Sequence, residues 1–191
     1  NASQLNIMYG LRGERRLTEL ELDWLDGYAD SKPVRTGNDA HRQFQLDVFG
    51  ELVNALYVAE QAGLEPEKDS WNVLLKLMEY LETAWQEPDD GIWEVRGPRR
   101  HFTHSKVMAW VAFDRMLQMK DGHDAEAGAR WLSLRDQIHA QVCDRGYERS
   151  QNAFVQYYDG EDLDASLLMI PMVGFLPAND PRMVGTVEAI S

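Results

Sequence analysis

Apolar residues return every three or four positions through most of this chain, and this period constrains the fold more than any other feature. The clearest stripe consists of Trp71, Leu74, Leu75, Met78, Leu81 and Trp85. A stripe with this spacing predicts an amphipathic helix that buries one face. Asp69 or Ser70 is expected to cap its N-terminus, because both side chains can accept a hydrogen bond from a free backbone N–H.

Similar stripes predict further helices on both sides of this one. An earlier helix is expected from Asp39 onward, with Gly63 as its stop. Its buried stripe is formed by Leu46, Phe49, Val53 and Leu56. Residues 103–119 are apolar on nearly every side until Asp114, as in a helix surrounded by others. The stripe of the following helix, over residues 124–142, is formed by Ala127, Trp131, Leu134, Ile138 and Val142.

The order of these elements predicts an all-α fold built from about three helical hairpins. Residues 163–172 and 181–190 are expected to form the third, shorter pair, and Pro181 suits a first helical turn. Helix starts lie roughly 60 residues apart, so the hairpin repeats without a repeat of its sequence. A short strand is expected over residues 154–158, which are aromatic and β-branched.

The first 38 residues follow a different pattern. Asn1 and Ala2 match the dipeptide that commonly remains after removal of an expression tag. Residues 5–9 and 19–25 are predicted to form a short β-hairpin around a turn at Gly13, and residues 31–38 an ordered loop. The predicted division is therefore residues 1–38 as tag remnant, hairpin and loop, and residues 39–191 as the helical part.

Composition excludes several classes of protein. The 191 residues are 44% apolar and include six Trp, enough for a core, and the apolar run near residues 167–176 is interrupted and too short to cross a membrane. The net charge of −13 would repel phosphate backbones, so nucleic acid is not an expected partner. A lone cysteine, Cys143, excludes an internal disulfide and predicts a cytoplasmic location.

The strongest functional signal lies in residues 87–110, which read EPDDGIWEVRGPRRHFTHSKVMAW. Trp93 offers a flat face for a sugar ring, and Glu94 places a carboxyl group beside that face. Partial desolvation by Trp93 and the apolar flanks would raise the affinity of this carboxyl for a proton, which suits a general acid. The alternatives are that Trp93 is a buried structural residue and that Glu94 is a loop carboxylate paired with Arg96 or Arg99. His101 and His104 are spaced for one helical face, but no third ligand accompanies them, so neither a metal nor another cofactor is expected.

With their flanks, these residues resemble the bacterial branch of glycoside hydrolase family 15. The matching segments, in the family's order, are IMYGLRGERRLTELELDWLDGY, SKPVRTGNDAHRQFQLDVFGE, GIWEVRG, RHFTHSKVMAW and LDASLLMIPMVGFLP. The resemblance implies a partial (α/α)6 toroid, the first half of a glycosidase barrel, and an inverting hydrolase that acts on α-glucosides such as trehalose, short α-glucans or starch ends. No membrane partner is expected either, because no apolar run is long enough to cross a bilayer.

The same resemblance assigns roles to individual residues. Glu94 aligns with the family's general acid, and Asn38 and Asp39 with a pair that holds the non-reducing glucose. Asp164 aligns with an aspartate on the substrate side, whereas Trp93, Arg96, His104 and Lys106 are expected to bind sugar from their positions near Glu94. The family's catalytic base lies in a later Glu-Glu motif, and no two glutamates are adjacent in these 191 residues.

The missing base leads to further expectations and alternatives. The chain is expected to be a fragment that is inactive by itself, and an incomplete ring predicts self-association through its exposed face. Two other functions remain open from the sequence: a non-catalytic carbohydrate-binding remnant, and a helical module that binds another protein through its acidic surface.

Overall fold

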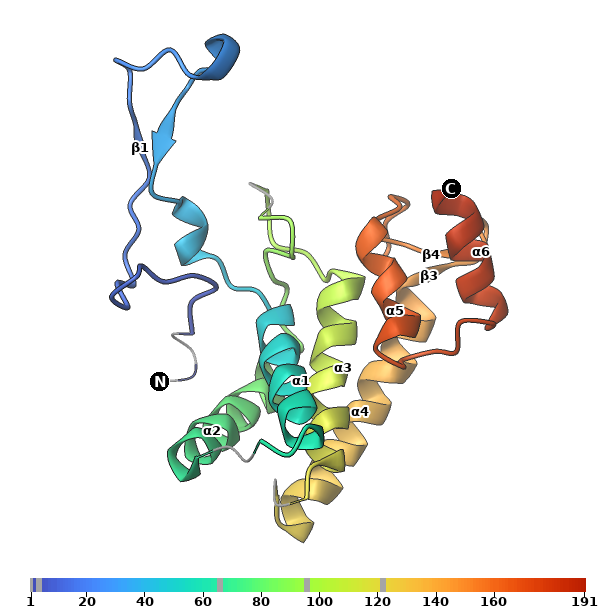
Figure 1. Ribbon diagram of the computed structural model, residues 1–191. Helices are drawn as coiled ribbons and strands as arrows, with labels where there is room; N and C mark the ends of the chain where they lie inside the picture. The colour runs from blue at the N-terminus through green and yellow to red at the C-terminus, as the bar shows by residue number, and fades with distance from the viewer. Residues whose placement is uncertain (1, 3–4, 65–66, 95–96, 121–122) are drawn as a thin grey trace. The chain divides into compact units, whose positions relative to one another are not determined.

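The computed structural model describes residues 2, 5–64, 67–94, 97–120 and 123–191 (Figure 1). Its contacts divide the chain into a small unit over residues 4–44 and a helical unit that covers residues 45–191. Each unit is described separately below. Among the described residues, no helix combines the length and the apolar character needed to cross a lipid bilayer.

The small unit contains a two-stranded antiparallel ladder. Strand β1 (Leu20–Glu21) pairs with β2 (Arg35–Thr36), so that Leu20 lies opposite Thr36 and Glu21 opposite Arg35. The predicted hairpin exists, but its expected partner strand, residues 5–9, was wrong. The strand that pairs instead lies later in the chain, and the guanidinium of Arg35 reaches the carboxylate of Glu21 across the ladder at 2.9 Å.

A short 3-10 turn, Asp39–Arg42, follows the ladder. The side chain of Asn38 caps this turn by accepting a hydrogen bond from the backbone N–H of Ala40 at 2.9 Å. Gln43 then adopts an extended conformation, with ψ at 147°. The helix predicted from Asp39 onward therefore begins eight residues later than expected, because the chain leaves the helical region at Gln43.

The helical unit opens with the hairpin α1 (Asp47–Gln61) and α2 (Lys68–Ala84). Gly63 follows α1 with φ at 81°, a conformation that favours glycine, so the predicted stop is confirmed.

The predicted cap of α2 was wrong. Glu67 occupies the N-cap without a side-chain hydrogen bond, and both Asp69 and Ser70 lie inside the first turn. Four members of the predicted stripe are nevertheless buried: Leu74, Met78, Leu81 and Trp85. Trp71 is only half-buried, and the predicted burial of Leu75 was wrong, because 41% of this residue is exposed.

Helix α3 (Thr103–Gln118) is the centre of this unit, and its predicted bounds and burial are confirmed. It packs against α1 on one side and against α4 (Ala125–Arg145) on the other. Figure 1 shows α1 and α3 running in the same direction, with α4 returning antiparallel. Gly50 permits the close approach of α1, because a side chain there would overlap the backbone carbonyl of Met108.

Asp124 caps α4 by accepting from the N–H of Ala127 at 2.8 Å. A second ladder, β3 (Tyr147–Glu148) with β4 (Ala153–Phe154), follows it. The strand expected over residues 154–158 is therefore shorter and begins one residue earlier. Its remainder still pairs with other backbone: the N–H of Thr103 donates to the carbonyl of Gln156 at 2.9 Å.

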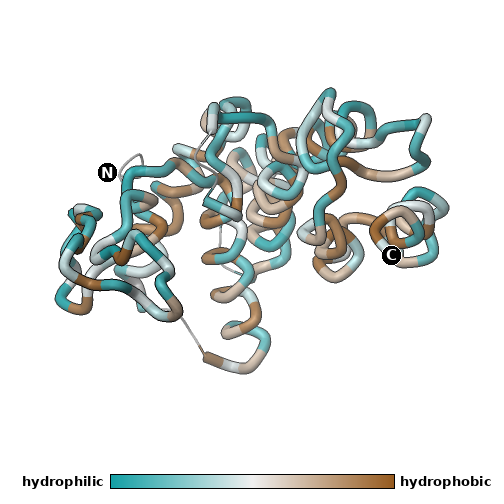
Figure 2. Tube along the Cα trace, turned by 90° about the horizontal axis from the view of Figure 1, so that it is seen from above, coloured by the Kyte–Doolittle hydropathy of each residue, from teal (hydrophilic) through white to brown (hydrophobic). Residues whose placement is uncertain are grey.

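The last hairpin contains a 3-10 turn (Ala165–Leu168) that continues into α5 (Met169–Met172), and then α6 (Pro181–Ile190). Polar and apolar stretches alternate along the helices when the molecule is seen from above, in keeping with their three-to-four spacing (Figure 2). Helix α3, covered by α1, α4 and the lighter contacts of α2 and α5, is an inner helix. Consecutive hairpins with inner helices that run in one direction form part of an (α/α)6 toroid, which confirms the predicted fold class.

Candidate active site

The loop that carries Trp93 and Glu94 is closed by a backbone pair, Asp89 with Arg100, just before the N-terminal end of α3. The backbones of Asp89 and Arg100 exchange two hydrogen bonds, N to O, at 2.9 and 3.0 Å. These bonds close the loop two residues before Phe102, the N-cap of α3. The loop therefore projects from a fixed pair of residues.

Buried side chains attach this pair, the base of the loop, to the helices. The carboxylate of Asp89 is fully buried and accepts from the backbone N–H of Leu46 at 3.1 Å, at the start of α1. The ammonium of Lys106, also fully buried, donates to the backbone carbonyls of Trp85 and Glu87 at 2.5 and 2.6 Å. The loop base is thus held from α1 and from the first turn of α3.

Burial shifts the pKa values of the ionisable groups at the foot of the loop. It lowers the pKa of Lys106 to about 8, against the attraction of Asp89, and it raises the pKa of Asp89. Asp47, in the first turn of α1, has a pKa raised to about 6 by burial and by the negative charge of Asp89. The Lys106 ammonium donates to backbone carbonyls in this structure. Its expected contact with a sugar stays a prediction.

The tip of the loop is a turn over residues 91–94. Gly91 has φ at 72°, and a side chain there would overlap the ring of Phe102. Glu94 also has a positive φ, at 52°, which is uncommon for a residue other than glycine and often marks a functional position.

Trp93 and Glu94 are both exposed at this tip. The exposed fraction of Trp93 is 57%, so the interpretation as a buried structural tryptophan was wrong. Glu94 is exposed as well, whereas partial desolvation of its carboxyl group was expected. The guanidinium of Arg99 contacts Asp90 at 3.1 Å.

The structure brings Trp93 and Asp164 together across 71 positions of sequence. The indole Nε1 of Trp93 donates to Oδ2 of Asp164 at 2.7 Å. The same oxygen accepts from the side-chain amide of Gln156 at 2.6 Å, and Oδ1 accepts from the backbone N–H of Ser166 at 2.6 Å. Burial acts to raise the pKa of Asp164, but the hydrogen bonds from Ser166, Gln156 and Trp93 outweigh it, and the pKa is lowered.

His104 lies beside this cluster in the first turn of α3. Burial lowers its pKa to about 4, and the negative charge of Asp164 only partly opposes this effect. Its imidazole is therefore neutral at physiological pH. Within the described part of the chain, neither ring nitrogen has a hydrogen-bond partner.

The other predicted sugar ligands are placed differently. Arg96 lies outside the described residues. Asn38 and Asp39 belong to the small unit, where Asn38 caps the 3-10 turn and Asp39 is exposed. The sequence analysis missed Gln156 and Asp89. The contact of Gln156 left no local signal, whereas Asp89 could have been noticed as a carboxylate beside Pro88 at the edge of the loop.

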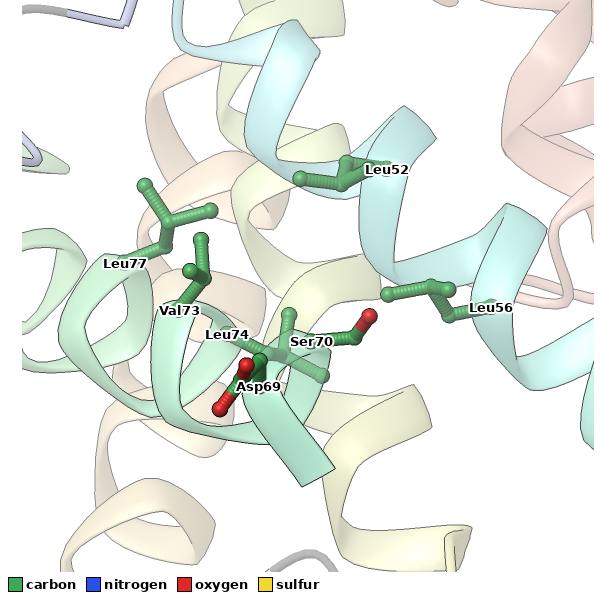
Figure 3. A pocket seen from close by; sticks show the side chains of 7 residues that line it. All are labelled: Leu52, Leu56, Asp69, Ser70, Val73, Leu74 and Leu77. Atoms are coloured by element: carbon green, nitrogen blue, oxygen red, sulfur yellow. The ribbon is translucent and has the colours of Figure 1, made fainter. Parts of the chain in front are cut away.

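One hollow lies beside the loop and another between two helices. A pocket of about 230 Å³ beside the loop is lined by Gly97, Pro98, Arg100, Phe102, Gln156, Tyr157 and Asp162. A second hollow, of about 360 Å³, lies between α1 and α2, where Leu52 and Leu56 face Val73, Leu74 and Leu77 (Figure 3). Its lining is mostly aliphatic. The self-association expected through the exposed face of the incomplete ring stays a prediction.

The helical hairpins with the inner helix α3 belong to the α/α toroid class of folds, and an exposed tryptophan and a glutamate lie on the loop that precedes α3. A wild-type glycosidase of known structure superposes with a TM-score of 0.69 at 20% identity, over 84% of this chain and 44% of its own. A glycosidase variant in complex with glucose gives the same TM-score at 19% identity. At this level of identity the similarity concerns the fold.

The family follows from the sequence. The model of the glycosyl hydrolases family 15 matches residues 1–191, and the chain belongs to this family. The trehalase of Mycobacterium tuberculosis is 42% identical over 98% of this chain, and the trehalase of Thermoplasma acidophilum is 37% identical over 98%. The chain covers 28% and 32% of the length of these two relatives. The predicted resemblance is confirmed.

Proposed function

We propose that the whole protein is an inverting glycoside hydrolase that acts on α-glucosides, with trehalose as the first candidate substrate. Glu94 acts as general acid and gives a proton to the departing glycosidic oxygen. The observation that carries this proposal is the loop tip, where an exposed indole and a carboxyl group stand together on a base held by α1 and α3. Membership of family 15 and relatives named trehalase support the substrate class.

The exposure of Trp93 and Glu94 fits a site that is completed by its substrate. A pyranose ring stacked on the free face of Trp93 would exclude water from the neighbouring carboxyl. Excluding water increases the proton affinity of a carboxylate, so the group would gain acid character when the sugar is bound. Hydrolysis with inversion also needs a carboxylate that activates water on the opposite face of the sugar. We assign that base to a part of the protein outside these 191 residues.

The remaining predicted ligands belong to the same proposal. Asn38 and Asp39 hold the terminal glucose, and Arg96 binds a hydroxyl group near the acid. His104 is neutral and could donate and accept one hydrogen bond each. Location in the cytoplasm is part of the proposal as well, supported by the single Cys143.

The test is the activity of the whole protein toward trehalose, maltose, isomaltose and soluble starch, with Glu94→Gln as the variant. Since a general acid contributes about 10² to 10⁴ in rate, kcat on the best substrate should fall by that factor. Glu126→Gln is the matched control, because Glu126 is 87% exposed in the first turn of α4 and should leave turnover unchanged. Unchanged turnover in Glu94→Gln would remove the assignment of the acid. Sugar binding without turnover in the wild type would favour the carbohydrate-binding alternative.

A further inference from the structure

The link between Trp93 and Asp164 joins two loops that precede two different helices. Trp93 lies in the loop before α3, and Asp164 caps the 3-10 turn that leads into α5. A hydrogen bond of 2.7 Å from an indole N–H to an ionised carboxylate is a charge-assisted bond, stronger than one between neutral groups. The bond is therefore suited to fix the direction of the indole ring.

The carboxylate of Asp164 has little capacity left for a sugar. A carboxylate offers about four acceptor positions, and three are already filled by Trp93, Gln156 and the backbone of Ser166. The residue is also buried, with an exposed fraction of 8%. A sugar hydroxyl would have to reach one remaining position on a covered group.

The indole, in contrast, depends on this bond. With 57% of its surface exposed, Trp93 lacks the packing on all sides that holds a core tryptophan in one orientation. Glu94, the next residue, belongs to the same turn and has a positive φ of 52°. Loss of the bond would therefore free the stacking surface and loosen the turn that carries the acid.

Asp164 itself is held by the frame of the site. Its second partner, Gln156, accepts the backbone N–H of Thr103 at 2.9 Å through its own carbonyl, at the first residue of α3. The backbone N–H of Gln156 donates to the carbonyl of Asp162 at 2.7 Å. The anchor of the indole is thus attached to the helix from which the loop projects.

We propose that Asp164 is a positioning residue, which orients Trp93 and through it Glu94, and that it does not bind the substrate directly. This inference rests on the proposed function, since it assigns the stacking surface and the acid to Trp93 and Glu94. It differs from the role that the family resemblance implies for Asp164, which is contact with the sugar. The two roles predict different kinetics.

A double-mutant cycle in the whole protein separates them. Asp164→Asn keeps an oxygen for the N–H of Ser166 but removes an acceptor from the indole, and Trp93→Phe keeps a ring without the N–H. If Asp164 acts through Trp93, Asp164→Asn should lower kcat on trehalose by about ten- to a hundredfold in the wild type and have little further effect in Trp93→Phe. If it binds sugar directly, the two losses should multiply, and the proposal fails.

A readout that is independent of turnover follows the indole itself. In protein labelled with 5-fluorotryptophan, the ¹⁹F resonance of Trp93 is identified by its absence in Trp93→Phe. Asp164→Asn should shift or broaden this resonance. Asp136→Asn is the matched control: this carboxylate is exposed on α4, where it pairs with Arg135 at 2.9 Å, so the resonance and the activity should stay unchanged.

These measurements also separate the inference from the proposed function. If Glu94→Gln retains full activity, the assigned acid is wrong, yet the ¹⁹F resonance still reports whether Asp164 orients Trp93. An unchanged resonance in an Asp164→Asn protein that melts like the wild type would overturn the positioning role, whatever the enzyme hydrolyses. A shifted resonance together with non-multiplying losses would support it.

Discussion

Lys106 offers the sharpest test of how the loop is held. Its fully buried ammonium donates to the carbonyls of Trp85 and Glu87 and faces the charge of Asp89. Lys106→Met keeps the length and apolar stem of the side chain but removes the charge and all donors. Both carbonyls then lose this partner, and the carboxylate of Asp89 loses its opposite charge.

The cost can be worked from these contacts. A buried polar group left without a partner costs about 1–3 kcal/mol, and two carbonyls lose the Lys106 ammonium. Burial of the charge itself opposes folding, as the lowered pKa of Lys106 indicates, so its removal offsets part of this cost. We therefore expect Lys106→Met to lower the free energy of unfolding at pH 7 by about 1–3 kcal/mol. Urea titration followed by circular dichroism measures this loss. Addition of Asp89→Asn should recover part of it, because the stranded charge is then gone.

The pH dependence provides a second measurement. The pKa of Lys106 is about 8 in the folded protein, below its ordinary value of 10.5. Between these values the unfolded chain binds more protons than the folded one, so the stability contributed by this group rises as pH increases. The gap corresponds to about 3 kcal/mol at most. This rise should be present in the wild type and absent from Lys106→Met; a loss below about 1 kcal/mol at pH 7, or identical pH profiles, would refute the reasoning.

Two further predictions concern helix α1. The pKa of Asp47 is raised to about 6 from 3.8, so its stabilising contribution is complete below pH 3.8 and is lost as pH rises through 6. Asp47→Asn should remove this loss and raise the free energy of unfolding at pH 7 by up to about 3 kcal/mol. A variant whose stability still differs between pH 4 and pH 7 as in the wild type would contradict this. Gly50→Ala should force α1 away from the carbonyl of Met108 and lower stability by about 1–3 kcal/mol despite the better helix propensity of alanine, so a higher melting temperature in calorimetry would show that the helices adjust freely.

The helices were predictable because their signal is local. The extent of α3 and the start of α4 follow from spacing and residue type alone. The start of α1 was not predictable in this way. Residues 39–46 have the composition of a helix, and it is the Asn38 cap followed by the extended Gln43 that ends the short turn.

Contacts between distant residues account for what the sequence did not reveal. The carbonyls that Lys106 binds belong to residues 19 and 21 positions earlier in the chain, so spacing could not reveal these contacts. The pairing of β1 with β2 and the bond between Trp93 and Asp164 likewise join residues that no periodicity relates. Trp93 and Glu94 themselves could be selected as candidates, since a local motif carries both.

The pairing of Asp89 with Arg100 has a consequence for how such a site can change during evolution. Since both ends of the loop are fastened to helices, insertions or replacements between these two residues need not disturb the scaffold below. New lengths and chemistries at the tip could therefore arise by mutation while the barrel keeps its stability. Diversity of accepted sugars among related enzymes would then reside mainly in this segment.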